Sequence, residues 1–336
     1  MTRAVLVTGA TGFLGRHLLG ALHRDGIPAI AHVRDRATWP YRHDELGHVE
    51  LRDGALAGTP ASPRPIGAVI HAAGVIRHTR REPDALRFNV LGATQAVRAA
   101  HALGARAILI SSSGTVGCFR HPGIAADEHA PDAEAAIAHW PYYVSKLEAE
   151  REARALAAKL GVELVIVRLP VLLGPGDHRL RATGHVTRVL TGRVPFVPSG
   201  GISFADVRDV AAAIVGLAVR PAPRPVYHLP GTTASLAAFF QMVGEVSGVA
   251  ITDRRAPAWL LDGLALATRR LAVHALPDPV VLEMASHHWG FTSLWSHAEL
   301  GYASRAARQT LVDTVTWLRA HHPELALQPV RNRAAS

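Results

Sequence analysis

A tyrosine and a lysine four residues apart, Tyr142 and Lys146, stand in a stretch whose residue pattern is helical. Residues separated by four positions share one face of a helix, so the phenol and the ammonium would be neighbours. A free phenol has a pKa of about 10, and a nearby ammonium lowers it by favouring the phenolate. The pair could therefore exchange a proton with a substrate near neutral pH. Tyr143 is three positions from Lys146 and becomes the alternative only if the helical register is misread.

Three serines, Ser111, Ser112 and Ser113, follow an apolar run at residues 107–110 that is typical of a buried strand. They precede Tyr142 by about thirty residues. A hydroxyl at the end of a strand could donate a hydrogen bond to a substrate oxygen on which negative charge develops. The serines and the tyrosine–lysine pair together indicate proton transfer at a carbonyl or alcohol oxygen.

Glycines recur at every third position, Gly9, Gly12 and Gly15, between an apolar run at residues 4–7 and a helical stretch at residues 12–24. Gly9 would permit a tight turn, Gly12 would let the backbone approach a pyrophosphate, and Gly15 would let helix and strand pack closely. The helix N-terminus would add free N–H groups and the positive end of its dipole. The turn therefore predicts a dinucleotide site, whose lining would also include Thr11, Phe13 and Leu14.

Short apolar runs alternate with helical patterns along the first half of the chain. Runs that are apolar throughout are typical of strands buried on both faces of a parallel sheet. The alternation therefore predicts an α/β fold in which helices cover both faces of such a sheet. The expected strands lie at residues 4–7, 29–33, 68–70, 107–110, 164–167 and 226–229, and the expected helices at 12–24, 85–103, 142–160 and 205–219.

The composition limits what else the chain could be. Its 336 residues predict about two domains at ~150 residues each. A single cysteine, Cys118, rules out an internal disulfide and favours a reducing compartment. The formal net charge of +9 comes from scattered basic residues, so nucleic-acid binding has little support. No histidine or cysteine pattern typical of a metal site occurs, and no metal is expected. With no targeting segment and no apolar stretch long enough to span a membrane, we expect a cytoplasmic protein.

The glycine spacing together with the Tyr-x-x-x-Lys pattern resembles the extended short-chain dehydrogenase/reductase family, also described as the NAD-dependent epimerase/dehydratase superfamily. The resemblance implies a Rossmann doubly wound parallel sheet that binds NAD(P), followed by a smaller, mainly helical C-terminal substrate lobe. The dinucleotide-binding domain would comprise residues 1–178 and 204–231, the substrate lobe residues 179–203 and 232–327, and a tail residues 328–336. Members of this family are often homodimers through two helices, and the sequence leaves the oligomeric state of this chain open.

Site residues follow from the same resemblance. Lys146 would hold the nicotinamide ribose, and Ser112 would be the working serine, with Ser113 as the alternative. Asn89, counted among the cofactor-binding residues, would fix backbone or water. Further cofactor contacts would come from Asp53 and Gly54 at the adenine, from Ala72, Ala73 and Gly74 at a strand end, and from Ser111, Leu169, Pro170 and Val171.

The end of the second expected strand bears on the choice of cofactor. An NAD-preferring member would carry an acidic residue there to bind the ribose 2′-hydroxyl. This chain has Val33 followed by Arg34, and a guanidinium could bind a 2′-phosphate that an acid would repel. NADP(H) is therefore the expected cofactor, with NAD(H) as the alternative. The competing interpretation is that Arg34 and Arg36 are simply solvated.

Two departures from the family pattern indicate to which branch of the family the chain is similar. The acidic pair of nucleotide-sugar dehydratases is missing after the serines, where Ser113 and Gly114 stand, and Ile202 replaces an arginine typical of nucleotide-sugar epimerases. The segment 204–210 resembles dihydroflavonol reductases and 3β-hydroxysteroid dehydrogenases. We therefore expect an NADP(H)-dependent oxidoreductase for a ketone or secondary alcohol of a hydrophobic small molecule, with Tyr142 as general acid/base. The alternatives are a nucleotide-sugar epimerase and a non-catalytic NADP-sensing protein.

Apolar and aromatic residues of the expected substrate lobe could form the wall of such a pocket. Ordinary core packing of amphipathic helices is the competing interpretation for each of them. They are Trp259, Leu260, Leu261, Leu264 and Leu266, and later His287, His288 and Trp289.

Overall fold

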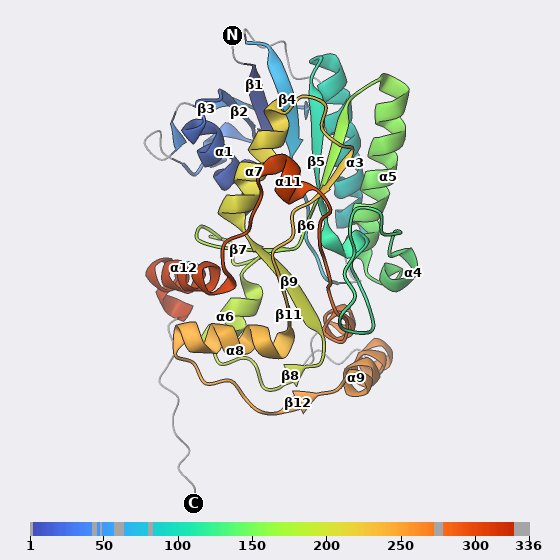
Figure 1. Cartoon of the computed structure of the whole chain (residues 1–336), viewed down its shortest axis with the longest axis vertical. Coiled ribbons are helices and arrows are strands. Elements are labelled where there is room, and N and C mark those ends of the chain that lie inside the picture. The colour runs from blue at the N-terminus through green and yellow to red at the C-terminus, as the bar shows by residue number, and fades with distance from the viewer. Residues whose placement is uncertain are drawn as a thin grey trace, which may run out of the picture.

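A seven-stranded parallel sheet forms the larger part of the computed structural model, which describes residues 3–41, 46–47, 49–56, 64–79, 83–271 and 278–325 (Figure 1). The strand order is β10-β6-β5-β4-β1-β2-β3, and every neighbouring pair is parallel. The order therefore reverses beside β1, which creates the crevice where doubly wound sheets bind ligands. The strands are β1 Ala4–Thr8, β2 Ala29–His32, β3 Val49–Arg52, β4 Ile66–His71, β5 Arg106–Ser112, β6 Leu164–Leu169 and β10 Val226–His228.

Helices cover both faces of this sheet, as the sequence predicts. Alternate residues of β1 divide between two cores: Val5 and Val7 join one hydrophobic cluster, and Ala4 and Leu6 join the other. The first cluster packs under α1 and α7, and the second under α3 and α5. Strands buried on both sides explain why the apolar runs have no polar alternation. The helices are α1 Phe13–Arg24, α3 Pro83–Ala102, α5 Pro141–Leu160 and α7 Val207–Val219, and the short α4 is Glu134–Ile137.

The second lobe lies below the sheet in Figure 1 and is mainly helical. It also contains strands that the sequence analysis does not predict, in a three-stranded sheet β11-β9-β7 and a β12-β8 pair. The helix expected from residue 205 begins at Val207, because the carboxylate of Asp206 accepts a hydrogen bond from the Arg208 N–H and caps it. The elements are β7 Val171–Leu173, α6 Gly184–Leu190, β8 Val197–Pro198, β9 Gly201–Asp206, β11 Thr232–Ser235, α8 Leu236–Ser247, β12 Arg255–Ala256, α9 Ala258–Leu271 and α10 Pro279–Met284.

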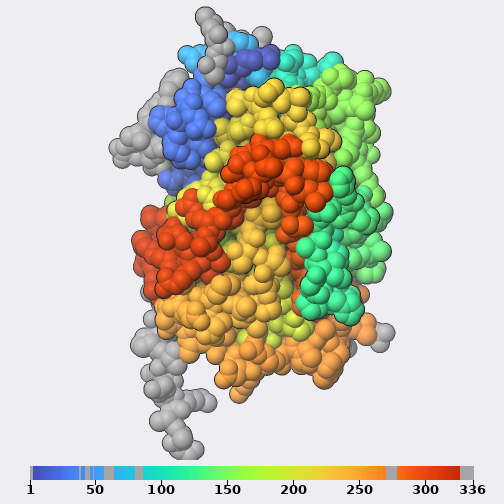
Figure 2. Space-filling model, viewed as in Figure 1, coloured from blue at the N-terminus to red at the C-terminus, as the bar shows by residue number. Residues whose placement is uncertain are grey.

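The C-terminal segment joins the two parts. Its helix α11 (Ser296–Leu300) contacts α7 beside the large sheet, and α12 (Ala307–His321) packs on α8 of the lobe. Figure 2 shows this red segment crossing the front of the molecule between the two parts. Glu128 reinforces the junction, since its carboxylate accepts hydrogen bonds from the His228 N–H and the Ser293 hydroxyl. No helix within the described ranges is both long and apolar enough to cross a membrane.

A buried ion pair fixes α5 against the sheet. Glu150, 1% exposed, accepts hydrogen bonds from Ser111 Oγ at 2.5 Å and from Arg168 Nη2 at 2.7 Å. Burial raises the pKa of Glu150, but the hydrogen bonds and charge of Arg168 outweigh it, and the net pKa lies below the usual value. Because Tyr142, Lys146 and Glu150 are spaced by four residues, this contact also orients the face of α5 that carries the tyrosine and the lysine.

Replacing Glu150 by alanine should therefore destabilise the protein strongly, because the buried guanidinium of Arg168 would lose its main partner. We expect a loss of about 3–5 kcal/mol in the free energy of unfolding, measured by urea denaturation. Arg151→Ala is the matched control on the same helix, since its ion pairs with Asp132 and Glu134 are solvent-exposed and should contribute at most about 1 kcal/mol. Equal, small losses for the two variants would contradict an anchoring role for Glu150.

Candidate active site

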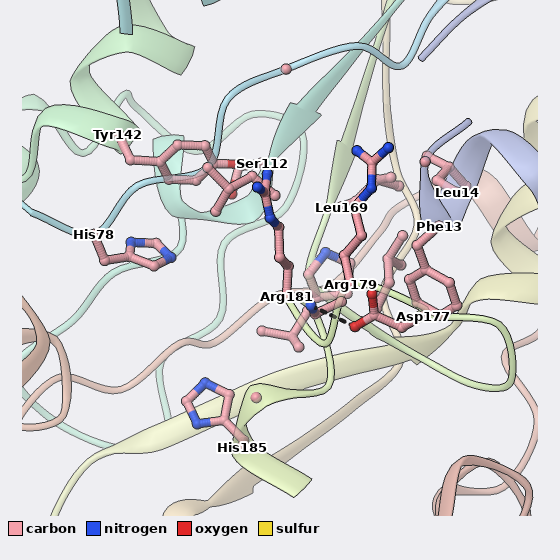
Figure 3. A pocket seen from close by; sticks show the side chains of 18 of the residues that line it. Phe13, Leu14, His78, Ser112, Tyr142, Leu169, Asp177, Arg179, Arg181 and His185 are labelled. Atoms are coloured by element: carbon pink, nitrogen blue, oxygen red, sulfur yellow. Dashed lines mark hydrogen bonds between the residues drawn. The ribbon is translucent and has the colours of Figure 1, made fainter. Parts of the chain in front are cut away.

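A cavity of about 930 Å³ runs along the carboxyl edge of the large sheet and into the lobe (Figure 3). Its walls come from the β1–α1 turn, the ends of β4, β5 and β6, the first turns of α5, the loop before α6, and the lobe helices α8 and α10. Fifteen of the expected catalytic and cofactor-binding residues line it together. They are Gly9, Thr11, Gly12, Phe13, Leu14, Gly15, Ala72, Gly74, Ser111, Ser112, Tyr142, Lys146, Leu169, Pro170 and Val171.

The β1–α1 turn has the backbone geometry that the glycine spacing predicts. Gly9 has a φ of +69°, and a Cβ there would lie 2.6 Å from the Ala73 nitrogen. A Cβ on Gly15 would collide with the Gly9 carbonyl oxygen. Helix α1 begins at Phe13, after the N-cap residue Gly12, and has no side-chain cap, so the N–H groups of its first turn have no acceptor inside the helix. The turn therefore fits the pyrophosphate of a dinucleotide, which needs close backbone approach and free N–H donors.

The cavity is also lined by the candidate catalytic residues Tyr142, Lys146 and Ser112. In Figure 3 the phenol of Tyr142 points toward Ser112. Lys146 Nζ donates to the Ile110 carbonyl at 2.9 Å, and Ser112 Oγ accepts from the Gly114 N–H at 3.2 Å. Helix α5 is continuous from Pro141 to Leu160 and ends on Gly161 with a left-handed φ of 68°, so Tyr142 and Lys146 have the expected i,i+4 relation.

The pKa values of this pair differ in part from the expectation. Burial raises the pKa of the Tyr142 phenol, whereas the sequence analysis expects the ammonium to lower it. Burial also lowers the pKa of Lys146 to about 8, against an opposing effect of the Glu150 charge. The removal of water around the phenol is the cause of its raised pKa, and the Lys146 ammonium donates to the Ile110 carbonyl oxygen. Tyr142 is accordingly uncharged at neutral pH.

Tyr143 is built into the wall rather than placed beside Lys146. Its ring lies over Gly114, where a Cβ would collide with it, and 5.1 Å from the Trp289 ring. Trp140, which packs against Tyr143 and Trp289, donates its indole N–H to Glu283. The glycine after the serines therefore makes room for an aromatic cluster that supports the first turn of α5.

Asn89 and Ala73 lie behind the cavity wall. Asn89 is buried, and its amide bonds both the N–H and the C=O of Val75 and donates to the Ser145 hydroxyl. This clamp holds the end of β4 against α5, which agrees with the backbone-fixing role expected of Asn89. The Ala73 N–H lies 3.4 Å from the hydroxyl of Thr8. The same hydroxyl shares a hydrogen bond with His71, whose pKa burial lowers to about 3, so His71 is neutral.

The residues expected at the adenine end also lie outside the cavity lining. Arg34 is exposed just beyond β2. Asp53 forms an ion pair with Arg36 at 3.2 Å, and the carbonyl of Gly54 shares a hydrogen bond with His32. These contacts place the three expected residues around the ends of β2 and β3, beside the crevice.

Fewer residues of the lobe line the cavity than the sequence analysis expects for the wall of a substrate pocket. Trp289 lines the cavity, together with Phe240, Val281 and Met284. Trp259 is instead 74% exposed on α9, and Leu261 is buried in a small core between α9 and α10. A helical pattern shows which residues share a face, but the packing partner of that face depends on tertiary structure.

The loop between β7 and α6 contains cavity residues that the sequence analysis does not single out. Asp177 is buried, and its carboxylate accepts hydrogen bonds from the N–H groups of Ala182 and Thr183 and from the Thr183 hydroxyl. The loop folded around it extends the side chains of Arg179 and Arg181 into the cavity (Figure 3). The run of basic residues after Gly176 was the available signal.

Comparisons with known proteins identify the family of the chain. The sequence model of the NAD dependent epimerase/dehydratase family matches residues 5–228. A putative dihydroflavonol 4-reductase of Synechocystis is 28% identical over 341 residues, covering 96% of each chain. The crystal structure of gox2253 has a TM-score of 0.80 with 28% identity, covering 96% of this chain and 99% of that one. Thermus thermophilus UDP-glucose 4-epimerase in complex with NAD has a TM-score of 0.70 with 20% identity, and covers 94% and 99%; it shows the fold alone.

The chain therefore belongs to the NAD dependent epimerase/dehydratase family, as the resemblance predicts. Its curated relatives include reductases of the dihydroflavonol 4-reductase type. The family is enzymatic, and its fold is the seven-stranded Rossmann-like sheet described above.

The lowered pKa of Lys146 can be measured directly, because Lys146 and Lys159 are the two lysines of the sequence. Protein labelled with ¹³C at lysine Cε should give two titrating resonances, and Lys159→Arg identifies the exposed one by removing it. We expect the Lys146 signal to titrate near pH 8, because burial disfavours its ammonium. A Lys146 resonance that stays fully protonated up to pH 10 would contradict this environment.

Proposed function

We propose that this protein is an NADP(H)-dependent oxidoreductase that interconverts a ketone and a secondary alcohol on a hydrophobic small molecule. The observation that carries the proposal is that one cavity is lined both by the glycine turn and by Tyr142, Lys146 and Ser112. In Figure 3 the phenol of Tyr142 points toward Ser112. The turn fits a dinucleotide, and the side chains fit proton transfer to an oxygen atom of a bound substrate.

In the direction of reduction, the substrate carbonyl lies between the phenol of Tyr142 and the hydroxyl of Ser112. When bound, the reduced nicotinamide supplies the hydride that adds to the carbonyl carbon. Tyr142 donates its proton to the carbonyl oxygen, and the resulting phenolate regains a proton from solvent. Ser112 donates a hydrogen bond to the oxygen as negative charge develops there. The ammonium of Lys146 stabilises the phenolate and holds the nicotinamide ribose.

The raised pKa of Tyr142 supports reduction as the favoured direction. A phenol whose proton is retained at neutral pH is ready to act as an acid, whereas oxidation of an alcohol needs the phenolate as base. Oxidation should therefore require a higher pH than reduction.

The walls of the cavity support a substrate with an apolar body. Phe240, Met284 and Trp289 line the lobe side, and Ile76 and Val281 lie at the same cavity. Ile202 also lines it, where an arginine is typical of nucleotide-sugar epimerases. This substitution gives the epimerase alternative less support than the reductase.

Replacing Tyr142 by phenylalanine should lower kcat for ketone reduction by about 10²–10⁴-fold, because the general acid is lost. NADPH oxidation at 340 nm with a panel of aryl ketones measures the effect. Tyr143→Phe is the matched control, since this ring packs in the wall and should keep most of the activity. Turnover of Tyr142→Phe at the wild-type rate would remove the proposed role.

The same assay separates the two candidate serines. Ser112→Ala should lower kcat by about 10²-fold if its hydroxyl stabilises the oxyanion, and Ser113→Ala should have the smaller effect. The reverse order would assign the working hydroxyl to Ser113.

Arg34 should determine the choice between NADPH and NADH. Its exposed guanidinium stands at the end of β2, while the neighbouring Arg36 is engaged by Asp53. Arg34→Ala should lower the ratio of kcat/KM for NADPH over NADH by about tenfold or more, since a charge-assisted contact to the 2′-phosphate is lost. Arg98→Ala, an exposed position on α3, should leave the ratio unchanged. Equal use of both cofactors by the unmodified enzyme would contradict the preference.

A further inference from the structure

Three arginines line the cavity without a carboxylate partner. They are Arg179, Arg181 and Arg188, all solvent-exposed, and no ion pair or hydrogen bond joins their side chains to another described residue. Other arginines of the fold are matched with carboxylates at close range, as in Arg106–Glu163 and Arg305–Asp209. The cavity therefore holds guanidinium groups whose positive charge no carboxylate of the described chain neutralises.

The one carboxylate among the lining residues of this cavity does not serve these arginines. Asp177 is 2% exposed, and its hydrogen bonds go to Ala182 and Thr183 of its own loop. The cavity is thus lined by apolar side chains and by exposed guanidinium groups, and such a positive wall attracts an anion.

The negative charge of a bound cofactor would balance only part of the positive charge of these arginines. Its pyrophosphate fits the glycine turn and the N-terminus of α1. In Figure 3 the side chain of Arg179 extends beside Leu14 and Leu169, on the side of that turn. The side chain of Arg181 extends instead toward Ser112 and Tyr142, where the reacting oxygen would lie. Arg188 belongs to α6, on the lobe side of the cavity.

A buried polar atom near the same end of the cavity also lacks a partner. Nδ1 of His78 is buried without a hydrogen bond, and no partner for it is found among the described residues. The His78 ring lies 5.2 Å from the Tyr142 ring and lines the cavity. Leaving such an atom unsatisfied is costly, so a polar group of a ligand is expected beside Tyr142.

We propose that Arg181 binds an anionic group of the substrate, a carboxylate or a phosphate, with Arg188 adding to the positive field. The preferred substrates are then hydrophobic oxo-acids or oxo-phosphates rather than neutral ketones. This inference rests on the proposed oxidoreductase function and narrows its substrate class. The planar guanidinium of Arg181 suits either anion, because both accept two parallel hydrogen bonds.

The test compares a keto acid with its uncharged ester. The probes are 4-oxo-4-phenylbutanoate and benzoylformate, each beside its methyl ester, so that two spacings between ketone and charge are sampled. Isothermal titration calorimetry measures their affinity for the NADP⁺-bound protein, and this readout needs no turnover. We expect at least one acid to bind about tenfold more tightly than its ester.

The variants assign that preference to one residue. Arg181→Gln should reduce the acid-over-ester preference to near unity and leave ester binding unchanged. Arg193→Gln is the control, because Arg193 is exposed just after α6 and lies outside the cavity lining. Equal affinities of acid and ester, binding of none of the four probes, or equal weakening of acid and ester in Arg181→Gln would overturn the proposal.

Two further measurements separate the sources of the anion. NADPH fluorescence titration should show similar cofactor affinity for Arg181→Gln and the unmodified protein; a tenfold loss there, with the acid preference intact, would assign Arg181 to the cofactor and overturn the proposal. Tighter binding of UDP than of any keto acid, dependent on Arg181, would indicate a nucleotide sugar and also overturn it. A separate result, full ketone-reducing activity of the Tyr142→Phe variant, would contradict the proposed oxidoreductase mechanism rather than the substrate class.

Discussion

The buried contact between Glu150 and Arg168 determines how the active-site helix faces the cavity. A helix can rotate about its axis, and each residue of rotation would move Tyr142 and Lys146 away from the substrate. Glu150 prevents this because its carboxylate is bonded at once to β5 through Ser111 and to β6 through Arg168. A charge buried this deeply tolerates few arrangements, since any shift leaves a group unpaired in a medium of low polarity. The position of the Tyr142 phenol thus depends on an ion pair two helical turns away.

The same carboxyl edge of the sheet organises the rest of the cavity. The strand order reverses beside β1, so the glycine turn and the end of β4 meet there, and Asn89 holds the latter against α5. The lobe closes the opposite side with apolar and aromatic side chains. A cofactor and a substrate can therefore share one enclosure, with the serines and Tyr142 between them. The unpaired arginines give this enclosure its charge, and they distinguish it from a purely apolar pocket.

Much of this arrangement is predictable because it depends on local rules. The apolar runs, the glycine turn and the i,i+4 spacing of Tyr142 and Lys146 each follow from backbone geometry over a few residues. The small strands β9 and β11 are harder to predict, because their pairing depends on contacts within the lobe. Trp259 illustrates the same difficulty: its helix is amphipathic, yet this aromatic residue lies on the solvent side of α9.

The order of residues alone determined the family and the parallel sheet, and it singled out the tyrosine, the lysine and the glycines that line the cavity. Tertiary structure decided the environment of those groups. Burial, which no short pattern encodes, reverses the expected direction of the Tyr142 pKa and lowers that of Lys146. Tertiary structure also brings Arg179 and Arg181 into the cavity, because the loop that carries them folds around the buried carboxylate of Asp177. Charge and solvation are set by neighbours from distant parts of the chain, and only the folded protein brings those neighbours together.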